Sequence, residues 1–140
     1  MGFATVRAAL AGFVADATRG GRRAGRLQDV HYLIAQLSDT HVGGPHFENG
    51  HRLSLAVDAI NAMTVQPDLV LVTGDLTHEG SAEQWSEFSD RMNGLRSAWQ
   101  AIAGNHDRSI AELAGHRTLD AGSLRLVLLD SSRDEFTADD

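Results

Sequence analysis

The sequence predicts an α/β fold with a mainly parallel sheet and flanking helices. Four short apolar runs predict the strands, at residues 31–38, 68–74, 98–104 and 124–130. Strands covered on both faces of a sheet have this nearly continuous apolar character. Helical periodicity separates the first three runs, and the alternation of strand and helix predicts parallel pairing through right-handed crossovers. A chain of 140 residues is long enough to bury one such core.

The N-terminal segment, residues 1–27, is predicted to be a basic extension, helical or disordered, that precedes a domain over residues 28–140. Apolar residues from Phe3 to Ala17 recur at helical spacing. The extension carries a net charge of +4, whereas the rest of the chain carries −11. A basic amphipathic helix that touches a membrane or a partner is the alternative interpretation. Residues 20–25 are expected to form a linker.

Two helices are expected between the first three strands. The apolar face of the first comprises Leu53, Ala56, Ile60 and Met63. Pro67 ends this connection. The second helix is predicted to begin at Ser81, which forms a capping-box pattern with Gln84, and to stop at Gly94. Its apolar stripe comprises Trp85, Phe88 and Met92.

The fourth apolar run is preceded by a different kind of connection. Residues 108–115 predict only a short helix, and residues 117–126 predict a hairpin around Ala121 and Gly122. We therefore expect an antiparallel or edge pairing late in the chain. The last ten residues, 131–140, contain no terminating pattern, which predicts a chain cut off within its domain.

Composition excludes several functional classes. The absence of cysteine excludes disulfides, zinc–thiolate sites, iron–sulfur clusters and a cysteine nucleophile. The acidic body disfavours nucleic acid as a partner and suits cations. No apolar stretch approaches the roughly 20 residues of a membrane-spanning helix, and the N-terminus lacks the order of a secretory signal. We therefore expect a cytoplasmic protein with no membrane partner.

Polar side chains follow the first three predicted strands. Asp39 and His41 follow the first strand, Asp75 follows the second, and Asn105 follows the third, at intervals of 36 and 30 residues between Asp39, Asp75 and Asn105. Each interval matches one βαβ unit, so the topology gathers these groups at the sheet edge where ligands bind. Asp39 and His41, two apart in an extended turn, can chelate one ion. Oxygen and nitrogen donors suit Mn, Fe or Zn.

Each of these residues also has an ordinary structural interpretation. Asp39 and Asp75 taken singly are typical turn formers, and His41 alone is typical of a solvated loop. The pair Gly104–Asn105 is typical of a tight turn. Their joint occurrence at three successive strand ends favours a metal site. A bridging carboxylate and a neutral amide would suit two ions about 4 Å apart, which together can clamp a phosphate.

Three sequence blocks resemble the first signature motifs of the calcineurin-like metallophosphoesterases. They are SDTHVGG, LVLVTGDLTHEG and AIAGNHDR, and with the later LRLVLLDSS they are similar to the class III cyclic-nucleotide phosphodiesterases. The resemblance implies the N-terminal half of an α-β-β-α sandwich. It implies two transition-metal ions (Mn, Fe or Zn), with Asp39 and His41 on the first, Asp75 bridging and Asn105 on the second. His106 is implied as the catalytic residue, a general acid or an electrostatic partner of the phosphoryl group.

The implied function is a metal-dependent phosphoester hydrolase of the phosphodiesterase type. In such an enzyme a metal-bound hydroxide attacks phosphorus, and the substrate is a small phosphoester such as a cyclic nucleotide. A homodimer is one assembly that the resemblance implies. The alternative is a catalytically inactive truncated remnant of such an enzyme. A plain nucleotide-binding domain is disfavoured because no G-x-G-x-x-G or Walker loop follows a strand.

The chain departs from the family pattern after its third block. That pattern continues with a strand-end histidine and a G-H-x-H block, whereas this chain has one histidine, His116, after Asp107. We therefore expect it to bind at most one ion well, through Asp39, His41 and Asp75.

Three further histidines match no ligand motif of the family. His78 stands where protein Ser/Thr phosphatases have an aspartate, which disfavours that activity. We expect His46, His51 and His78 to be solvated loop or helix residues, with His46 as a candidate for the substrate entrance.

Overall fold

The computed structural model describes residues 7–11, 32–45, 48–122 and 124–132. The strands are β1 (Arg7–Ala11), β2 (Tyr32–Ser38), β3 (Leu69–Thr73), β4 (Ala98–Ile102), β5 (Arg117–Ala121) and β6 (Leu124–Leu128). The α-helices are α1 (Glu48–Asn61) and α2 (Ala82–Met92), and two short 3-10 turns are η1 (Asn105–Asp107) and η2 (Ala111–Leu113).

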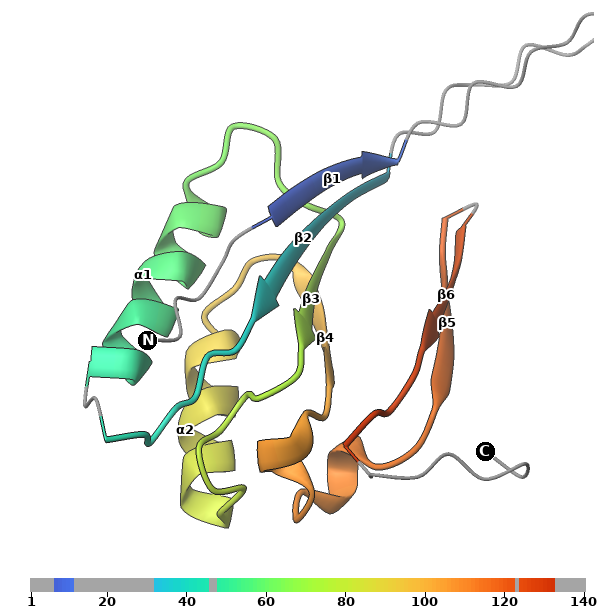
Figure 1. The fold of residues 1–140 in the computed structure, drawn as a ribbon. Coiled ribbons are helices and arrows are strands. Elements are labelled where there is room, and N and C mark those ends of the chain that lie inside the picture. Colours follow the sequence, from blue (N-terminus) through green and yellow to red (C-terminus); the bar gives the residue numbers. More distant parts are fainter. Residues whose placement is uncertain (1–6, 12–31, 46–47, 123, 133–140) are drawn as a thin grey trace, which may run out of the picture.

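The central sheet has the strand order β1-β2-β3-β4 (Figure 1). Strands β2, β3 and β4 are parallel, with Leu37 beside Val72 and Val72 beside Ala101. The predicted β-α-β-α-β arrangement is therefore confirmed. Because the three strands point the same way, the loops that follow Ser38, Thr73 and Ile102 all leave from one edge of the sheet.

Strand β1 differs from the helix that the sequence pattern predicted for the N-terminal segment. Residues 7–11 pair antiparallel with β2, with Arg7 opposite Gln36 and Ala11 opposite Tyr32. Pairing satisfies the backbone groups along the outer edge of β2. Such a tertiary contact outweighs a weak helical periodicity. The predicted linker at 20–25 and the domain boundary after residue 27 lie outside the described residues.

Helices α1 and α2 lie on the same face of the sheet (Figure 1). Between them and the sheet lies a continuous core that contains Ala35, Leu37, Leu53, Val57, Ile60, Val70, Val72, Phe88, Met92 and Ala101. Leu53 and Ile60 of α1 are buried as predicted, as are Phe88 and Met92 of α2. Each large apolar side chain buried in this way contributes roughly 1.5–3 kcal/mol.

The opposite face of the sheet is more polar than the sequence analysis expected. Gln36 and Gln100 are exposed there, and the Gln36 Nε2 donates a hydrogen bond to the Thr73 hydroxyl at 2.8 Å. The expectation that both faces are covered is therefore wrong within the described residues. Successive side chains of a strand point to opposite faces of the sheet, so the central sheet has one apolar face and one face of mixed polarity.

The N-terminus of α2 shows half of the predicted capping box. The Ser81 hydroxyl caps the helix by accepting a hydrogen bond from the Gln84 backbone amide at 3.3 Å. The Gln84 side chain instead accepts from the Glu79 amide at 2.8 Å and donates to the Gly43 carbonyl at 3.4 Å. Gln84 thereby connects the loop after β2 to the loop after β3.

Strands β5 and β6 form a separate two-stranded sheet that stands beyond β4 (Figure 1). This confirms the predicted hairpin at Ala121 and Gly122. The expectation that the last apolar run is covered on both faces is wrong, because Val127 is 60% exposed and Leu129 is 57% exposed. Arg117 donates to the Ala101 carbonyl and so connects the hairpin to β4. The short helix predicted over residues 108–115 is the single 3-10 turn η2.

Candidate metal centre

The loops that follow β2 and β3 run side by side and are joined through their backbones. The Asp39 amide donates to the Gly74 carbonyl at 3.2 Å, and the His41 amide donates to the Asp75 carbonyl at 2.9 Å. One residue further on, the Val42 amide donates to the Leu76 carbonyl at 3.0 Å. This ladder places the side chains of Asp39, His41 and Asp75 on neighbouring positions.

All three of these residues have a left-handed backbone conformation. The φ angles are 57° at Asp39, 44° at His41 and 49° at Asp75, and no other non-glycine residue in the described part of the chain has a positive φ. The expectation of an extended turn at Asp39 and His41 is therefore wrong. This conformation costs about 1–2 kcal/mol per residue. Such strain is concentrated at functional sites because the surrounding structure holds the side chains in place.

One ligand-type atom from each of Asp39, His41 and Asp75 lies within 4.8 Å of the others. The His41 Nε2 lies 3.7 Å from the Asp75 Oδ2, and the two side chains are 23% and 17% exposed. The His41 Nδ1 is buried and has no hydrogen-bond partner among the described residues. Two carboxylates and one imidazole with an unsatisfied nitrogen are a donor set that suits Mn²⁺, Fe²⁺ or Zn²⁺. The residues present therefore fit the predicted ion.

The loop after β4 closes against Asp75. A Cβ atom added at Gly104 would lie 2.2 Å from the Asp75 amide nitrogen and 2.3 Å from its Oδ1. The His106 amide donates a hydrogen bond to the same Asp75 Oδ1 at 3.2 Å. Asn105 lies between these two contacts, at the start of η1, and is exposed. Its role as a ligand to a second ion stays a prediction.

Asp107 connects the loop after β3 to the loop after β4. Its carboxylate is fully buried and accepts hydrogen bonds from the backbone amides of Leu76, Thr77 and Gly104, each at 2.9 Å. The Thr77 hydroxyl donates a further bond at 2.7 Å. From the sequence, Asp107 was visible only as part of the AIAGNHDR block. Its place in a G-N-H-D block was the only signal of this structural role.

His106 packs between two other histidines. Its Nδ1 donates to the His78 carbonyl at 2.6 Å, and because a carbonyl only accepts, Nδ1 carries a proton and the Nε2 of the neutral ring has a free lone pair. Its ring centroid lies 4.9 Å from that of His41 and 5.5 Å from that of His78. His78 is half-buried, so the expectation that it is a solvated loop residue is wrong. His51 is exposed on α1, as expected, and His46 lies outside the described residues.

Comparison with known proteins agrees with this geometry. The family model for calcineurin-like phosphoesterases matches residues 32–136. The chain belongs to this family. The matched residues include every strand end that contributes to the site.

Named members of the family include cyclic-nucleotide phosphodiesterases. The chain is 31% identical over 117 residues to the 3′,5′-cyclic adenosine monophosphate phosphodiesterase CpdA of Pseudomonas aeruginosa, an alignment that covers 74% of this chain and 43% of CpdA. It is 28% identical to a 3′,5′-cyclic-nucleotide phosphodiesterase of Nostoc sp., over 71% of this chain and 42% of that protein. A probable glycerophosphodiester phosphodiesterase, GpdQ of Arcobacter nitrofigilis, is 29% identical over 55% of this chain and 30% of its own length. The chain thus spans less than half the length of these relatives.

Side chains from both helices hold the loop that follows β2. The Asn49 side chain, in the first turn of α1, donates to the His41 carbonyl at 3.0 Å. Gln84 of α2 holds the Gly43 carbonyl of the same loop. The Thr40 hydroxyl donates to the Leu76 carbonyl at 2.6 Å. The strained backbone of this loop is therefore held by contacts with α1, with α2 and with the loop after β3.

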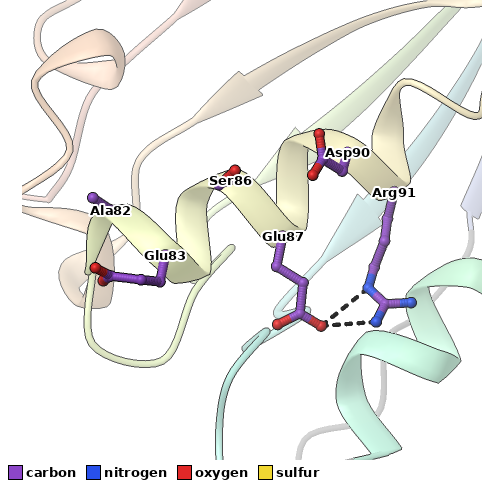
Figure 2. A pocket seen from close by; sticks show the side chains of 6 residues that line it. All are labelled: Ala82, Glu83, Ser86, Glu87, Asp90 and Arg91. Carbon is purple, nitrogen blue, oxygen red and sulfur yellow. Dashed lines mark hydrogen bonds and ion pairs between the residues drawn. The ribbon is translucent and has the colours of Figure 1, made fainter.

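A surface depression on α2 is separate from this centre. Its lining residues are Ala82, Glu83, Ser86, Glu87, Asp90 and Arg91 (Figure 2). Arg91 pairs with Glu87 at 2.8 Å and donates to the Ser54 hydroxyl of α1 at 2.6 Å, so it connects the two helices. No ligand-type residue of the metal centre lines this depression. No helix within the described ranges is both long enough and apolar enough to cross a membrane.

Proposed function

We propose that this chain supplies the first-ion site of a metal-dependent phosphodiesterase that acts on small phosphodiesters of the cyclic-nucleotide class. The observation that carries the proposal is the convergence of Asp39, His41 and Asp75 to within 4.8 Å. These residues follow parallel strands and have a strained backbone, so the fold orients their side chains at an energetic cost. Membership of the calcineurin-like phosphoesterase family supports the reaction class.

In this proposal Asp39, His41 and Asp75 hold one transition-metal ion. A bound ion in such a site supplies positive charge for the phosphoryl oxygens and makes a water molecule nucleophilic. The Asp75 Oδ1 already accepts a hydrogen bond from the His106 amide. Asp75 therefore links the ion to the loop that carries His106.

A second ion would use Asp75 and Asn105. The carboxylate of Asp75 is adjacent to the Asn105 loop, since Gly104 packs directly against it. Two donors from the described residues give a weaker hold than three. We therefore expect this chain to bind one ion tightly and a second one weakly, with Mn, Fe or Zn as the candidate metals.

His106 is the proposed acid for the leaving oxygen. Its Nδ1 is engaged with the His78 carbonyl, which orients the ring and leaves Nε2 as the atom that exchanges a proton. In the imidazolium form Nε2 donates that proton to the departing alkoxide, and the neutral ring remains. His106 also lies against His41, so the proton donor would stand beside a residue that would hold the first ion.

The experiment is a hydrolysis assay on the purified chain with Mn²⁺ and a bis-aryl phosphodiester. Wild type, Asp75→Ala and the control Asp58→Ala, an exposed carboxylate on α1, are compared. We expect Asp75→Ala to lose about 100-fold or more of the activity, because loss of a ligand exceeds the 10- to 100-fold effect of an outer-shell change. The control keeps its activity. Equal turnover by all three proteins would refute the site.

The inactive-remnant alternative gives a different result in the same assay. A remnant shows no hydrolysis in wild type, whatever the metal. For an active chain, a second assay compares a 3′,5′-cyclic nucleotide with a glycerophosphodiester, the two substrate classes in the names of its relatives. We expect faster hydrolysis of the cyclic nucleotide. A homodimer and a cytoplasmic location stay predictions from the sequence.

A further inference from the structure

His41, His78 and His106 form a second group of metal-ligand atoms beside the first. One ring nitrogen from each lies within 4.8 Å of the other two, and all three residues are half-buried. We propose that these three imidazoles bind a single Zn²⁺, Cu²⁺ or Ni²⁺ ion, in competition with the site formed by Asp39, His41 and Asp75. This goes beyond the proposed hydrolase activity, which does not use the His78 side chain.

The orientation of His106 supports this site. Its Nδ1 donates to the His78 carbonyl at 2.6 Å, so the lone pair of Nε2 is available. Ligating histidines commonly donate their other ring nitrogen to a backbone carbonyl in this way, which fixes both tautomer and orientation. The hydrogen bond thus prepares the His106 ring as a ligand.

The three imidazole rings lie close to one another. The rings of His78 and His106 are nearly parallel, at 23° and 5.5 Å between centroids. The His41 ring stands perpendicular to that of His106, at 90° and 4.9 Å, and lies 6.0 Å from that of His78. Among the described residues, the buried Nδ1 of His41 has no hydrogen-bond partner. His41 therefore has a ring nitrogen that no described protein group occupies.

The two sites differ in the ions that they favour. Three neutral imidazoles suit Ni²⁺, Cu²⁺ and Zn²⁺, and three histidines with one open position are a known zinc arrangement. The set of two carboxylates and one imidazole suits harder ions such as Mn²⁺. A neutral imidazole offers one lone pair, so His41 serves one ion at a time. The metal supplied therefore decides which site is filled.

Filling the three-histidine site would affect the proposed reaction. It removes His41 from the carboxylate site and engages the Nε2 of His106. We therefore infer that an ion held by the three histidines, such as Cu²⁺ or Ni²⁺, inhibits the Mn²⁺-dependent reaction.

The test measures metal binding directly on the purified chain. One equivalent of Cu²⁺ is added, and the electron paramagnetic resonance spectrum is expected to show three coordinated ring nitrogens in wild type and two in His78→Ala. Zn²⁺ affinity in His78→Ala is expected to fall by about 100-fold or more, because loss of a ligand exceeds the effect of an outer-shell change, with Mn²⁺ affinity unchanged. Asp39→Asn should show the opposite selectivity. His51→Ala, an exposed histidine on α1, should change neither affinity.

The outcomes separate this inference from the proposed function. Unchanged Zn²⁺ affinity in His78→Ala overturns the three-histidine site, as does an equal loss of Zn²⁺ and Mn²⁺ affinity. The proposed hydrolase is judged separately by Asp75→Ala. Circular dichroism reports whether His78→Ala is folded. If it is not, His106→Gln replaces it, because this change also removes one imidazole and should produce the same selective loss of Zn²⁺ affinity.

Discussion

The buried carboxylate of Asp107 accepts hydrogen bonds from both the backbone amide and the hydroxyl of Thr77, at 2.9 and 2.7 Å. With its bonds to Leu76 and Gly104, this contact holds the loop after β3 and the loop after β4 together at the candidate metal centre. No other side chain among the described residues connects these loops through so many backbone amides. The geometry of Asp75 and His106 therefore depends on a fully buried residue that is not one of the candidate metal ligands.

Removal of this carboxylate is predicted to destabilise the fold strongly. Asp107→Ala leaves three backbone amides and one hydroxyl without a partner in a buried position. Each unsatisfied group costs about 1–3 kcal/mol, so we expect the free energy of unfolding to fall by about 3 kcal/mol or more. Urea denaturation followed by circular dichroism measures this change. Asp58→Ala, at an exposed position on α1, is the control, and an equally small effect of both substitutions would contradict the prediction.

A methyl group at Gly104 is predicted to disrupt metal binding through Asp75. The added Cβ would lie 2.2 Å from the Asp75 amide nitrogen, so Gly104→Ala must displace the ligand loop. The φ of Gly104 is −102°, which any residue adopts, so the effect is purely steric. Isothermal titration with Mn²⁺ should show weaker binding by about 10-fold or more, as for other changes around a ligand.

Gly115→Ala is the matched control for this substitution. Gly115 has a φ of +89°, but a Cβ added there would have no other atom within 4 Å. Its replacement should cost about 1 kcal/mol in stability, from backbone conformation alone, with Mn²⁺ affinity retained. Loss of Mn²⁺ binding in both variants would show that general destabilisation, and not contact with Asp75, is the cause.

The left-handed backbone at Asp39 predicts that this residue lowers the stability of the metal-free protein while it provides a metal ligand. Asp39→Gly and Asp39→Ala both remove the carboxylate, but only glycine adopts a φ of 57° without strain. We expect the metal-free glycine variant to be more stable than the alanine variant by about 1 kcal/mol. Thermal unfolding without metal measures the difference. Both variants should bind Mn²⁺ poorly, and an alanine variant as stable as the glycine one would argue against strain at this position.

The sequence predicted the parts of the molecule that follow from local pattern. Apolar runs located β2, β3 and β4, and the periodicity of Leu53 and Ile60 or of Phe88 and Met92 located the buried faces of both helices. The candidate ligands Asp39, His41 and Asp75 could be inferred because parallel strands end at a common edge. The strands, the buried helix faces and the residues directly after each strand can all be read from short stretches of the sequence.

The remaining features depend on contacts between distant residues, which no local pattern encodes. His78 joins the histidine cluster because its carbonyl accepts a hydrogen bond from His106, in a different loop. The role of Asp107 arises from amides contributed by Leu76 and Thr77. Strand β1 forms because β2 offers it an edge, and over residues 7–11 this contact overrides the helical spacing of the sequence.

The most direct test of the metal centre is anomalous diffraction from crystals of this chain grown with Mn²⁺. We expect a manganese peak coordinated by Asp39, His41 and Asp75 at the ends of β2 and β3. This peak should be absent in Asp75→Ala and present in Asp58→Ala. A manganese peak bound elsewhere, with these three side chains uncoordinated in wild type, would contradict the proposed metal site.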